Sequence, residues 1–205
     1  MSDHAIVNVV LAGVGGQGSV LATRILAGAA RRAGFDVVTS EVHGMAQRGG
    51  TVTTIVRFGG SGGPGLAPAI GSGEADVLVA FERLEAARHL PLLHSEGLAL
   101  VNDQRITPNI ESLKLADYPD DLESMTRPRH ISLHLVPAFR LATELGEPRL
   151  ASTALLGALA NYLQLPVEAW RGAVVEAAPA KFVEANLAAF EAGREWGVGS
   201  PELSF

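Results

Sequence analysis

An apolar run, a glycine-rich turn and a helical pattern follow one another near the N-terminus, and this order constrains the fold more than any other feature of the sequence. Residues 6–11 are mostly apolar and rich in β-branched side chains, which is typical of a strand covered on both faces. Residues 13–18 read Gly-Val-Gly-Gly-Gln-Gly, and residues 19–33 place apolar side chains at helical spacing, with Gly34 where helices commonly end. A strand that leads through a tight turn into a helix predicts an α/β fold.

The rest of the chain first alternates strands and helices and then becomes helical. We expect further strands at residues 35–40, 51–58, 75–81, 97–102 and 130–136, and a short helix at residues 82–90. Four helices are predicted to follow, at residues 137–145, 149–163, 166–177 and 179–195. Residues 103–129 are expected to be irregular, and the glycine-rich residues 59–73 are expected to form a flexible loop. The sequence therefore predicts one domain over residues 1–205: a three-layer α/β/α fold with a Rossmann-like start, a mixed sheet and a helical C-terminal part at about 137–197.

Composition excludes several classes of function. The 205 residues include no cysteine, so this chain has no disulfide, no thiolate nucleophile and no cysteine ligand for an iron–sulfur cluster. A net charge of −6 argues against nucleic acid as the main partner, because nucleic-acid-binding proteins usually present a basic face. No stretch reaches the roughly 18 apolar residues of a membrane span, and the N-terminus lacks the basic region of a signal peptide. We therefore expect a cytoplasmic protein that binds neither nucleic acid nor membrane.

The turn at residues 13–18 fits the pattern G-x-G-x-x-G, which has three interpretations. Glycines let a phosphate approach the backbone, and free N–H groups at a helix N-terminus attract it, so the turn could bind a dinucleotide such as NAD. Glu41, at the end of the second predicted strand, could then bind the ribose. The turn could equally be a tight strand-to-helix connection without a ligand. In the third interpretation, the amide of Gln17 faces a partner or a substrate.

A second polar segment joins the second and third predicted strands. It reads Glu41-Val42-His43-Gly44-Met45-Ala46-Gln47-Arg48-Gly49-Gly50. If the sheet begins as a β-α-β unit, this segment lies at the same end of the sheet as the glycine turn, where such sheets bind their ligands. Arg48 is a fixed cation with five donors, suited to a carboxylate or a phosphate, and the two glycines after it leave space for a ligand. The alternative is a solvated loop with one ordinary arginine.

Two other patterns do not indicate a site. Residues 59–63 match the nucleophile elbow G-x-S-x-G, but they lie in a glycine tract, and no helical pattern follows Pro64. His130 and His134 would lie about 13 Å apart on a strand, which is too far for one metal ion. We therefore expect no metal site, and no single titratable residue stands out as a catalytic group.

Several segments closely resemble the gamma family of 2-oxoacid:ferredoxin oxidoreductases. They are residues 13–18, 25–27, 41–50 and 56–57. The version of the motif at residues 44–50 is similar to the beta subunits of the indolepyruvate ferredoxin oxidoreductases within that family. Residues 74–82, 101–102, 155–159 and 179–186 also resemble those subunits. The similarity spans most of the chain, and residues 41–50 are far more specific than the glycine turn.

This resemblance implies the non-cluster, non-thiamine-carrying subunit of a 2-oxoacid:ferredoxin oxidoreductase, with indolepyruvate or a related aryl 2-oxoacid as substrate. Such enzymes decarboxylate the 2-oxoacid on thiamine diphosphate, pass electrons through iron–sulfur clusters to ferredoxin, and release acyl-CoA. Thiamine and clusters are expected in a larger partner subunit, against whose active centre this chain packs on the coenzyme A side, so the chain is expected to be inactive alone. The residues expected to face the ligand or that active centre are Gly13, Gly15, Gly16, Gln17, Gly18, Met45, Gln47, Arg48 and Gly49. The alternative function is a free-standing Rossmann-like NAD(P)-binding protein.

Overall fold

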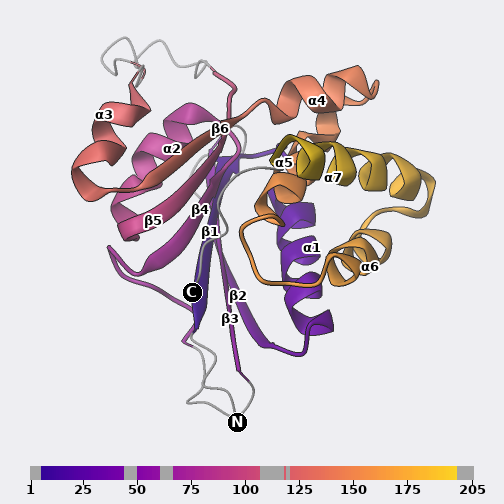
Figure 1. The fold of residues 1–205 in the computed structure, drawn as a ribbon, viewed down its shortest axis with the longest axis horizontal. Coiled ribbons are helices and arrows are strands. Elements are labelled where there is room, and N and C mark those ends of the chain that lie inside the picture. The colour runs from indigo at the N-terminus through magenta and orange to yellow at the C-terminus, as the bar shows by residue number, and fades with distance from the viewer. Residues whose placement is uncertain (1–5, 44–49, 61–66, 107–117, 119–120, 198–205) are drawn as a thin grey trace.

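A mixed six-stranded sheet forms the centre of the molecule (Figure 1). The computed structural model describes residues 6–43, 50–60, 67–106, 118 and 121–197. The strands are β1 Val7–Val14, β2 Asp36–His43, β3 Thr51–Gly59, β4 Ala75–Ala80, β5 Leu93–Asn102 and β6 Ser132–Val136, in the order β2-β3-β1-β4-β5-β6. β1, β4, β5 and β6 run parallel, whereas β3 is antiparallel to both β1 and β2. The last residues of the five co-directional strands therefore lie at one edge, which we call the carboxyl edge: Val14, His43, Ala80, Asn102 and Val136.

Helices cover both faces of this sheet. One face carries α1 Ser19–Arg32, α4 Ala138–Glu144, α5 Ala151–Leu159, α6 Val167–Ala177 and α7 Val183–Gly197, and the other carries α2 Arg83–His89 and α3 Leu122–Thr126. Short 3-10 helices are η1 Leu90–Leu92, η3 Arg127–Arg129, η4 Pro148–Leu150 and η5 Ala180–Phe182. Along β1, Val9 and Leu11 face the larger helical layer, whereas Val10 and Ala12 face the smaller one. Because central strands are buried on both faces, they read as continuous apolar runs in the sequence.

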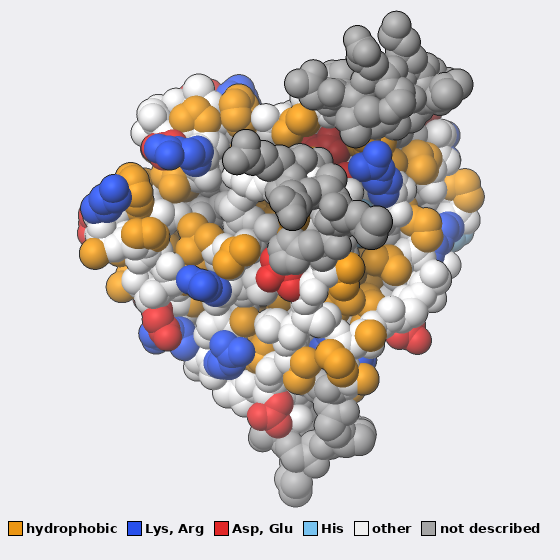
Figure 2. Space-filling model, turned by 180° about the vertical axis from the view of Figure 1, so that it is seen from behind, with side chains coloured by type: hydrophobic (Ala, Val, Ile, Leu, Met, Phe, Trp, Pro, Cys, Tyr) orange, Lys and Arg blue, Asp and Glu red, His pale blue; other side chains and the backbone are white. Residues whose placement is uncertain are grey.

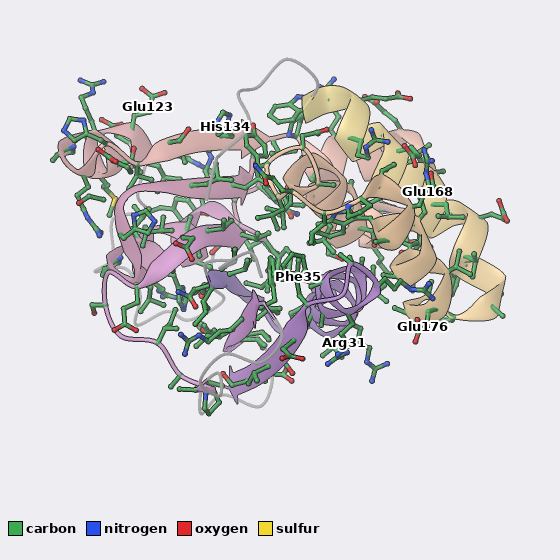
Figure 3. All side chains as sticks on the ribbon, turned by 60° about the horizontal axis from the view of Figure 1, so that its bottom comes forward. Arg31, Phe35, Glu123, His134, Glu168 and Glu176 are labelled. Atoms are coloured by element: carbon green, nitrogen blue, oxygen red, sulfur yellow. The ribbon has the colours of Figure 1, made fainter. Side chains whose placement is uncertain are left out.

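The helix that follows the glycine turn forms the inner part of the larger layer. Ile25 and Leu26 of α1 are fully buried, and the helix ends before Gly34, whose φ of +91° is a left-handed value that favours glycine. At its outer end, Arg32 forms an ion pair of 2.9 Å with Glu176 of α6. Figure 3 shows Glu176 near the end of α1 that carries Arg31, and Phe35 between α1 and the sheet. α6 is thus held on the outside of α1.

Two further helices of the same layer, α5 and α7, pack backbone against backbone. A Cβ on Gly157 of α5 would lie 1.9 Å from the carbonyl oxygen of Phe190, and a Cβ on Gly193 of α7 would lie 1.8 Å from that of Ala154. The absence of a side chain at both crossing points lets the helices approach each other closely. α5 is consequently almost entirely buried, from Ser152 to Leu159.

One face of the molecule, seen from behind, carries charges of both signs side by side. On the face opposite to that of Figure 1, acidic, basic and hydrophobic side chains are interspersed (Figure 2). Among the residues that the structure describes, no helix is long and apolar enough to cross a membrane.

The predicted three-layer α/β/α architecture, with its mixed sheet and helical C-terminal part, is confirmed. The start of the sheet departs from a Rossmann unit, because β3 lies between β1 and β2. The prediction that residues 103–129 are irregular was wrong in part, since they contain α3, capped by Asp121, and η3. The extent of one domain over residues 1–205 stays a prediction.

Several element limits also differ from those expected. β6 begins at Ser132 rather than at His130, because His130 has a φ of 54° and caps η3. Of the four predicted C-terminal helices, the second ends at Leu159 rather than at residue 163, and the fourth begins as a 3-10 turn. In the glycine-rich stretch, residues 61–66 lie outside the described residues. Arg57 binds the part that follows, donating hydrogen bonds to the carbonyls of Ala67 (2.6 Å) and Ala69 (3.1 Å).

Candidate functional site at the carboxyl edge

The glycine turn joins β1 to α1 at the carboxyl edge. Gly16 and Gly18 have φ values of +96° and +84°, which favour glycine. The N–H of Gly15 donates a hydrogen bond of 3.1 Å to the carbonyl of Gly50, the residue before β3. The turn and the end of the second polar segment therefore lie together, as the sequence predicted. The remaining predicted site residues of that segment lie outside the described residues: Met45, Gln47, Arg48 and Gly49.

The side chain of Gln17 folds back into its own turn. Its Oε1 accepts a hydrogen bond of 2.7 Å from the N–H of Val14, and its Nε2 donates one of 3.3 Å to the carbonyl of Phe81. Gly13 has no room for a side chain, because a Cβ there would lie 2.5 Å from Cδ2 of Phe81 and 2.9 Å from Oε1 of Gln17. The packing of the turn itself therefore accounts for Gly13 and engages both ends of the Gln17 amide.

The first turn of α1 also packs against the start of α5. Gly18 is the N-cap residue of α1, and a Cβ there would lie 2.5 Å from Oγ of Ser152. Ser152 is buried, with 2% of its surface exposed. A residue more than a hundred positions away in the sequence thus adds a steric reason for glycine at position 18 to that of its positive φ.

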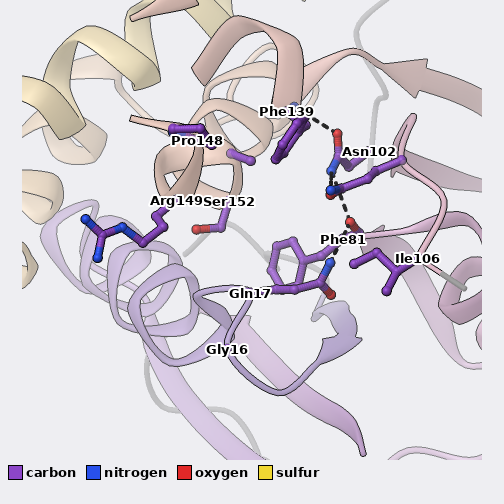
Figure 4. Close-up of a pocket in the computed structure, with 11 residues that line it drawn as sticks. Gly16, Gln17, Phe81, Asn102, Ile106, Phe139, Pro148, Arg149 and Ser152 are labelled. Carbon is purple, nitrogen blue, oxygen red and sulfur yellow. Dashed lines mark hydrogen bonds between the residues drawn. The ribbon is translucent and has the colours of Figure 1, made fainter. Parts of the chain in front are cut away.

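A pocket opens at this edge between the glycine turn and the starts of α4 and α5 (Figure 4). Its volume is about 180 Å³. It is lined by Gly16, Gln17, Phe81, Asn102, Gln104, Ile106, Phe139, Pro148, Arg149, Ala151 and Ser152. Ligands of open α/β sheets bind beyond the carboxyl ends of the strands, so this is the place where the fold favours a ligand.

A buried carboxylate adjoins the pocket but is engaged in structure. Glu82 is 1% exposed and accepts hydrogen bonds from the N–H groups of Leu84 (3.0 Å) and Glu85 (2.6 Å) at the start of α2. The hydroxyl of Tyr118 donates a third, of 2.5 Å, to the same carboxylate. Burial, together with this hydrogen bond to Glu82, raises the pKa of Tyr118, which therefore stays protonated at neutral pH. Glu82 anchors α2 and Tyr118 rather than offering a base to a ligand.

Comparison with known proteins identifies the family. Residues 8–196 match the family of pyruvate ferredoxin/flavodoxin oxidoreductases. The chain belongs to this family. Indolepyruvate oxidoreductase subunit IorB of Archaeoglobus fulgidus is 37% identical over 190 residues, which are 91% of this chain and 92% of the relative. The subunit of the same name from Thermococcus kodakarensis is 36% identical over 191 residues, which are 91% of this chain and 93% of the relative.

Solved structures of the family share the fold. The gamma subunit of the keto/oxoacid ferredoxin oxidoreductase of Geobacter sulfurreducens has a TM-score of 0.70 and 26% identity, over 95% of this chain and 99% of that one. The 2-oxoglutarate:ferredoxin oxidoreductase of Magnetococcus marinus has a TM-score of 0.72 and 18% identity, over 100% of this chain and 32% of that one, a likeness of fold alone. The predicted resemblance is confirmed: the chain is a homologue of IorB, a subunit of a 2-oxoacid:ferredoxin oxidoreductase.

Family membership and geometry both argue against the NAD(P)-binding alternative. Glu41 pairs with Thr54 of β3, which in turn pairs with Leu11 of β1. Glu41 therefore lies two strands from β1, about 10 Å away at the usual strand spacing, and beside the interior of β1 rather than its end. In Rossmann sheets the acidic residue that binds the ribose follows the strand next to the glycine turn. Here β3 occupies that position.

Side chains of α2 hold the start of β3, the strand that follows the second polar segment. Oγ1 of Thr51, the first residue of β3, donates a hydrogen bond of 3.0 Å to Oε1 of Glu85, and Nη1 of Arg88 lies 2.6 Å from the same oxygen. Oγ1 of Thr53 and Nε2 of His89 lie 2.8 Å apart. Glu85 is 1% exposed, so α2 fixes the start of β3 from inside the smaller layer.

Most residues that line the pocket were not predicted from the sequence to belong to the site. Phe81 and Asn102 end or follow buried strands, and that position at the carboxyl edge was a usable signal. Phe139, Arg149 and Ser152 come from the helical part, and nothing in their local sequence indicates contact with the glycine turn. Only the packing of α4 and α5 over the carboxyl edge brings them there.

His134 of β6 lies beside the helical layer and not in a metal site. Its ring centroid is 5.1 Å from that of Tyr162, and its Nε2 is 3.0 Å from Oγ of Ser132. Among the described residues, no three side chains of the metal-binding types His, Cys, Asp and Glu are grouped so that they could hold an ion.

Replacing His134 by glutamine should reduce the loss of stability at acid pH. Burial lowers the pKa of His134, so the unfolded chain binds this proton more tightly than the folded chain. The contribution of neutral His134 to the free energy of unfolding is therefore complete above the unfolded pKa of about 6.5. This contribution is lost as the pH falls toward the pKa of the folded state. The fall in melting temperature from about pH 7.5 to about pH 5.5 should be smaller in His134→Gln. His130→Asn is the control, since His130 is exposed and asparagine tolerates a positive φ. The same fall in all three proteins would contradict the prediction.

Proposed function

We propose that this chain is the small, cofactor-free subunit of a 2-oxoacid:ferredoxin oxidoreductase that acts on indolepyruvate or a related aryl 2-oxoacid. The complex decarboxylates the 2-oxoacid, passes the electrons to ferredoxin or a similar acceptor, and joins the acyl group to coenzyme A. The IorB relatives support this substrate class, because their names state indolepyruvate and this chain spans nearly their whole length.

One observation supports the position of the site. The glycine turn and residues 41–50 both resemble the family, and the hydrogen bond from Gly15 to Gly50 joins the turn to the end of that second segment beside the pocket. We assign this surface to the contact with the partner's active centre, on the side that coenzyme A approaches. Its proposed contact residues are Gly13, Gly15, Gly16, Gln17, Gly18, Met45, Gln47, Arg48 and Gly49.

The proposal places thiamine diphosphate and the iron–sulfur clusters in a larger partner subunit. The sequence has no cysteine, and iron–sulfur clusters are held chiefly by cysteine thiolates. The described pocket walls contain no carboxylate, the usual protein ligand of a magnesium ion bound to a diphosphate. The described walls of the pocket therefore do not fit thiamine diphosphate, and the part of this chain is to bind and orient at the edge of the partner's site.

The complex itself is the first test. We expect oxidation of indolepyruvate or phenylpyruvate, with coenzyme A, thiamine diphosphate and a redox dye under anaerobic conditions, only when this chain is co-expressed with its large subunit. The chain alone should be inactive and should show no thermal shift with NAD. Activity of the isolated chain, or a thermal shift with NAD and no complex with a large subunit, would overturn the proposal.

Replacing Arg48 by alanine should lower kcat/KM of the complex by about tenfold, the effect of losing roughly one charge-assisted hydrogen bond. The effect should appear in the dependence on coenzyme A, since a guanidinium is suited to carboxylate and phosphate groups. Arg31→Ala is the matched control, because Arg31 is an exposed arginine at the far end of α1 from the glycine turn. Unchanged turnover and unchanged dependence on coenzyme A in Arg48→Ala would remove this surface from the active centre.

A further inference from the structure

We infer that Asn102 is a positioning residue that sets the geometry of the glycine turn and the pocket for the partner's active centre. The inference rests on the proposed function and extends it to a residue outside the two family segments that form the proposed surface. Asn102 is the last residue of β5 and lies in the wall of the pocket (Figure 4). Only 2% of its surface is exposed, so its amide must find its partners within the protein.

The Asn102 amide uses both its donor and its acceptor. Its Nδ2 donates hydrogen bonds of 3.1 Å to the carbonyl of Phe81 and to Oε1 of Gln104. Its Oδ1 accepts one of 3.1 Å from the N–H of Phe139, at the start of α4. One side chain thus connects the end of β5 to the residue after β4 and to the helix that follows β6.

The Phe81 carbonyl continues this connection to the glycine turn. It accepts from Nδ2 of Asn102 and also from Nε2 of Gln17, whose Oε1 is bound to the N–H of Val14. Two primary amides therefore meet on one carbonyl oxygen and join the carboxyl ends of β1, β4 and β5. Asn102 acts on the site through Gln17 and Phe139, which line the pocket, so it is a positioning residue.

An aspartate at this position would separate positioning from folding. A carboxylate has nearly the shape of the amide and still accepts from Phe139, but it cannot donate to the Phe81 carbonyl and repels that oxygen. Burial raises the pKa of such a carboxyl toward neutrality, and the protonated acid regains one O–H donor. The loss of kcat/KM should therefore be largest at alkaline pH, and kcat/KM should partly recover as the pH falls.

Asn186→Asp is the matched control. Asn186 is 1% exposed and also uses both ends of its amide: Nδ2 donates to the carbonyl of Phe182 (2.9 Å), and Oδ1 accepts from Thr153 (2.8 Å). It lies between α5 and α7, and it is not part of the pocket wall. Both variants make the same chemical change at the same burial.

The experiment measures steady-state rates of the reconstituted complex with an aryl 2-oxoacid and coenzyme A, together with melting temperatures. For Asn102→Asp we expect kcat/KM to fall on the order of tenfold at about pH 8.5, with the deficit narrowing at about pH 6. Asn186→Asp should lose a similar amount of stability but keep kcat/KM within about twofold at both pH values. If Asn102→Asp does not fold, Asn102→Ser replaces it: the serine hydroxyl is too short to reach Phe81, Gln104 and Phe139 together, so kcat/KM should fall at both pH values. Wild-type kcat/KM in Asn102→Ser would then overturn the inference.

Three results would overturn the inference. Wild-type kcat/KM in Asn102→Asp, a deficit that does not change with pH, or an equal deficit in Asn186→Asp would each reduce Asn102 to a structural residue. In those cases, a loss of turnover in Arg48→Ala would leave the proposed function standing. An inactive wild-type complex would instead overturn the proposed function, and the role of Asn102 with it.

Discussion

Replacing Gly193 by alanine is expected to lower the free energy of unfolding by about 3 kcal/mol or more. A Cβ at this position would lie 1.8 Å from the carbonyl oxygen of Ala154 and 2.7 Å from its carbon. Both atoms belong to the backbone of α5, so no rotamer change can relieve the contact and the two helices must move apart. At 2–4 °C per kcal/mol for a chain of this size, the melting temperature should fall by roughly 6–12 °C.

The reciprocal change, Gly157→Ala, should have a comparable effect. Its Cβ would lie 1.9 Å from the carbonyl oxygen of Phe190. Because both alanines separate the same pair of helices, the double variant should be less destabilised than the sum of the two single changes. Thermal and urea unfolding of the three variants measures this coupling.

Gly172→Ala is the control for these helix variants. Gly172 lies within α6, and the nearest atom to its Cβ would be Nη1 of Arg32, at 2.8 Å. That atom is the end of a long, half-exposed side chain that can move, and alanine favours a helix over glycine by about 1 kcal/mol. Gly172→Ala should therefore be neutral or slightly stabilising. A loss of stability equal to that of Gly193→Ala would contradict the close helix contact as the cause.

Replacing Gly18 by alanine is expected to cost about 2–4 kcal/mol, from backbone strain and overpacking together. Gly18 has a φ of +84°, where an alanine is strained by about 1–2 kcal/mol. Its Cβ would also lie 2.5 Å from Oγ of Ser152 and 3.4 Å from Cβ of the same residue.

A double-mutant cycle with Ser152→Ala separates the two causes. Removing the hydroxyl leaves only the contact at 3.4 Å, which is an ordinary separation, so Gly18→Ala should be less damaging in the Ser152→Ala background. The strain at φ +84° should remain. If Gly18→Ala costs the same in both backgrounds, the contact between the turn and α5 contributes nothing, and the requirement for glycine is purely conformational.

Much of the fold could be predicted from local patterns. The apolar run of β1, the amphipathic pattern of α1 and the glycine at residue 34 each depend on neighbours in the sequence, and all three were located to within a few residues. α3 was missed because its five residues form barely more than one turn, too short for a periodic signal. The order of the strands was not predictable, because nothing near β3 indicates that it inserts between β1 and β2.

The candidate site was likewise predictable in part. The glycine turn and residues 41–50 carry dense local signals, and their meeting at one edge followed from strand direction alone. The roles of the individual residues did not follow. Gln17 was expected to face a partner or a substrate; it lines the pocket, and both ends of its amide are also bound within the protein, because Phe81, far along the chain, offers a carbonyl as acceptor.

The sequence by itself determined the class of the fold, the family and the inability of this chain to hold a cysteine-bound cluster, because these depend on periodicity, motif and composition. Only the tertiary structure decided why Gly13 and Gly18 must be glycines, which residues enclose the pocket, and that Asn102 joins its walls. Each of these depends on contacts between residues more than 20 positions apart. Such contacts depend on how the helical layers pack on the sheet, and no local pattern in the sequence predicts that packing.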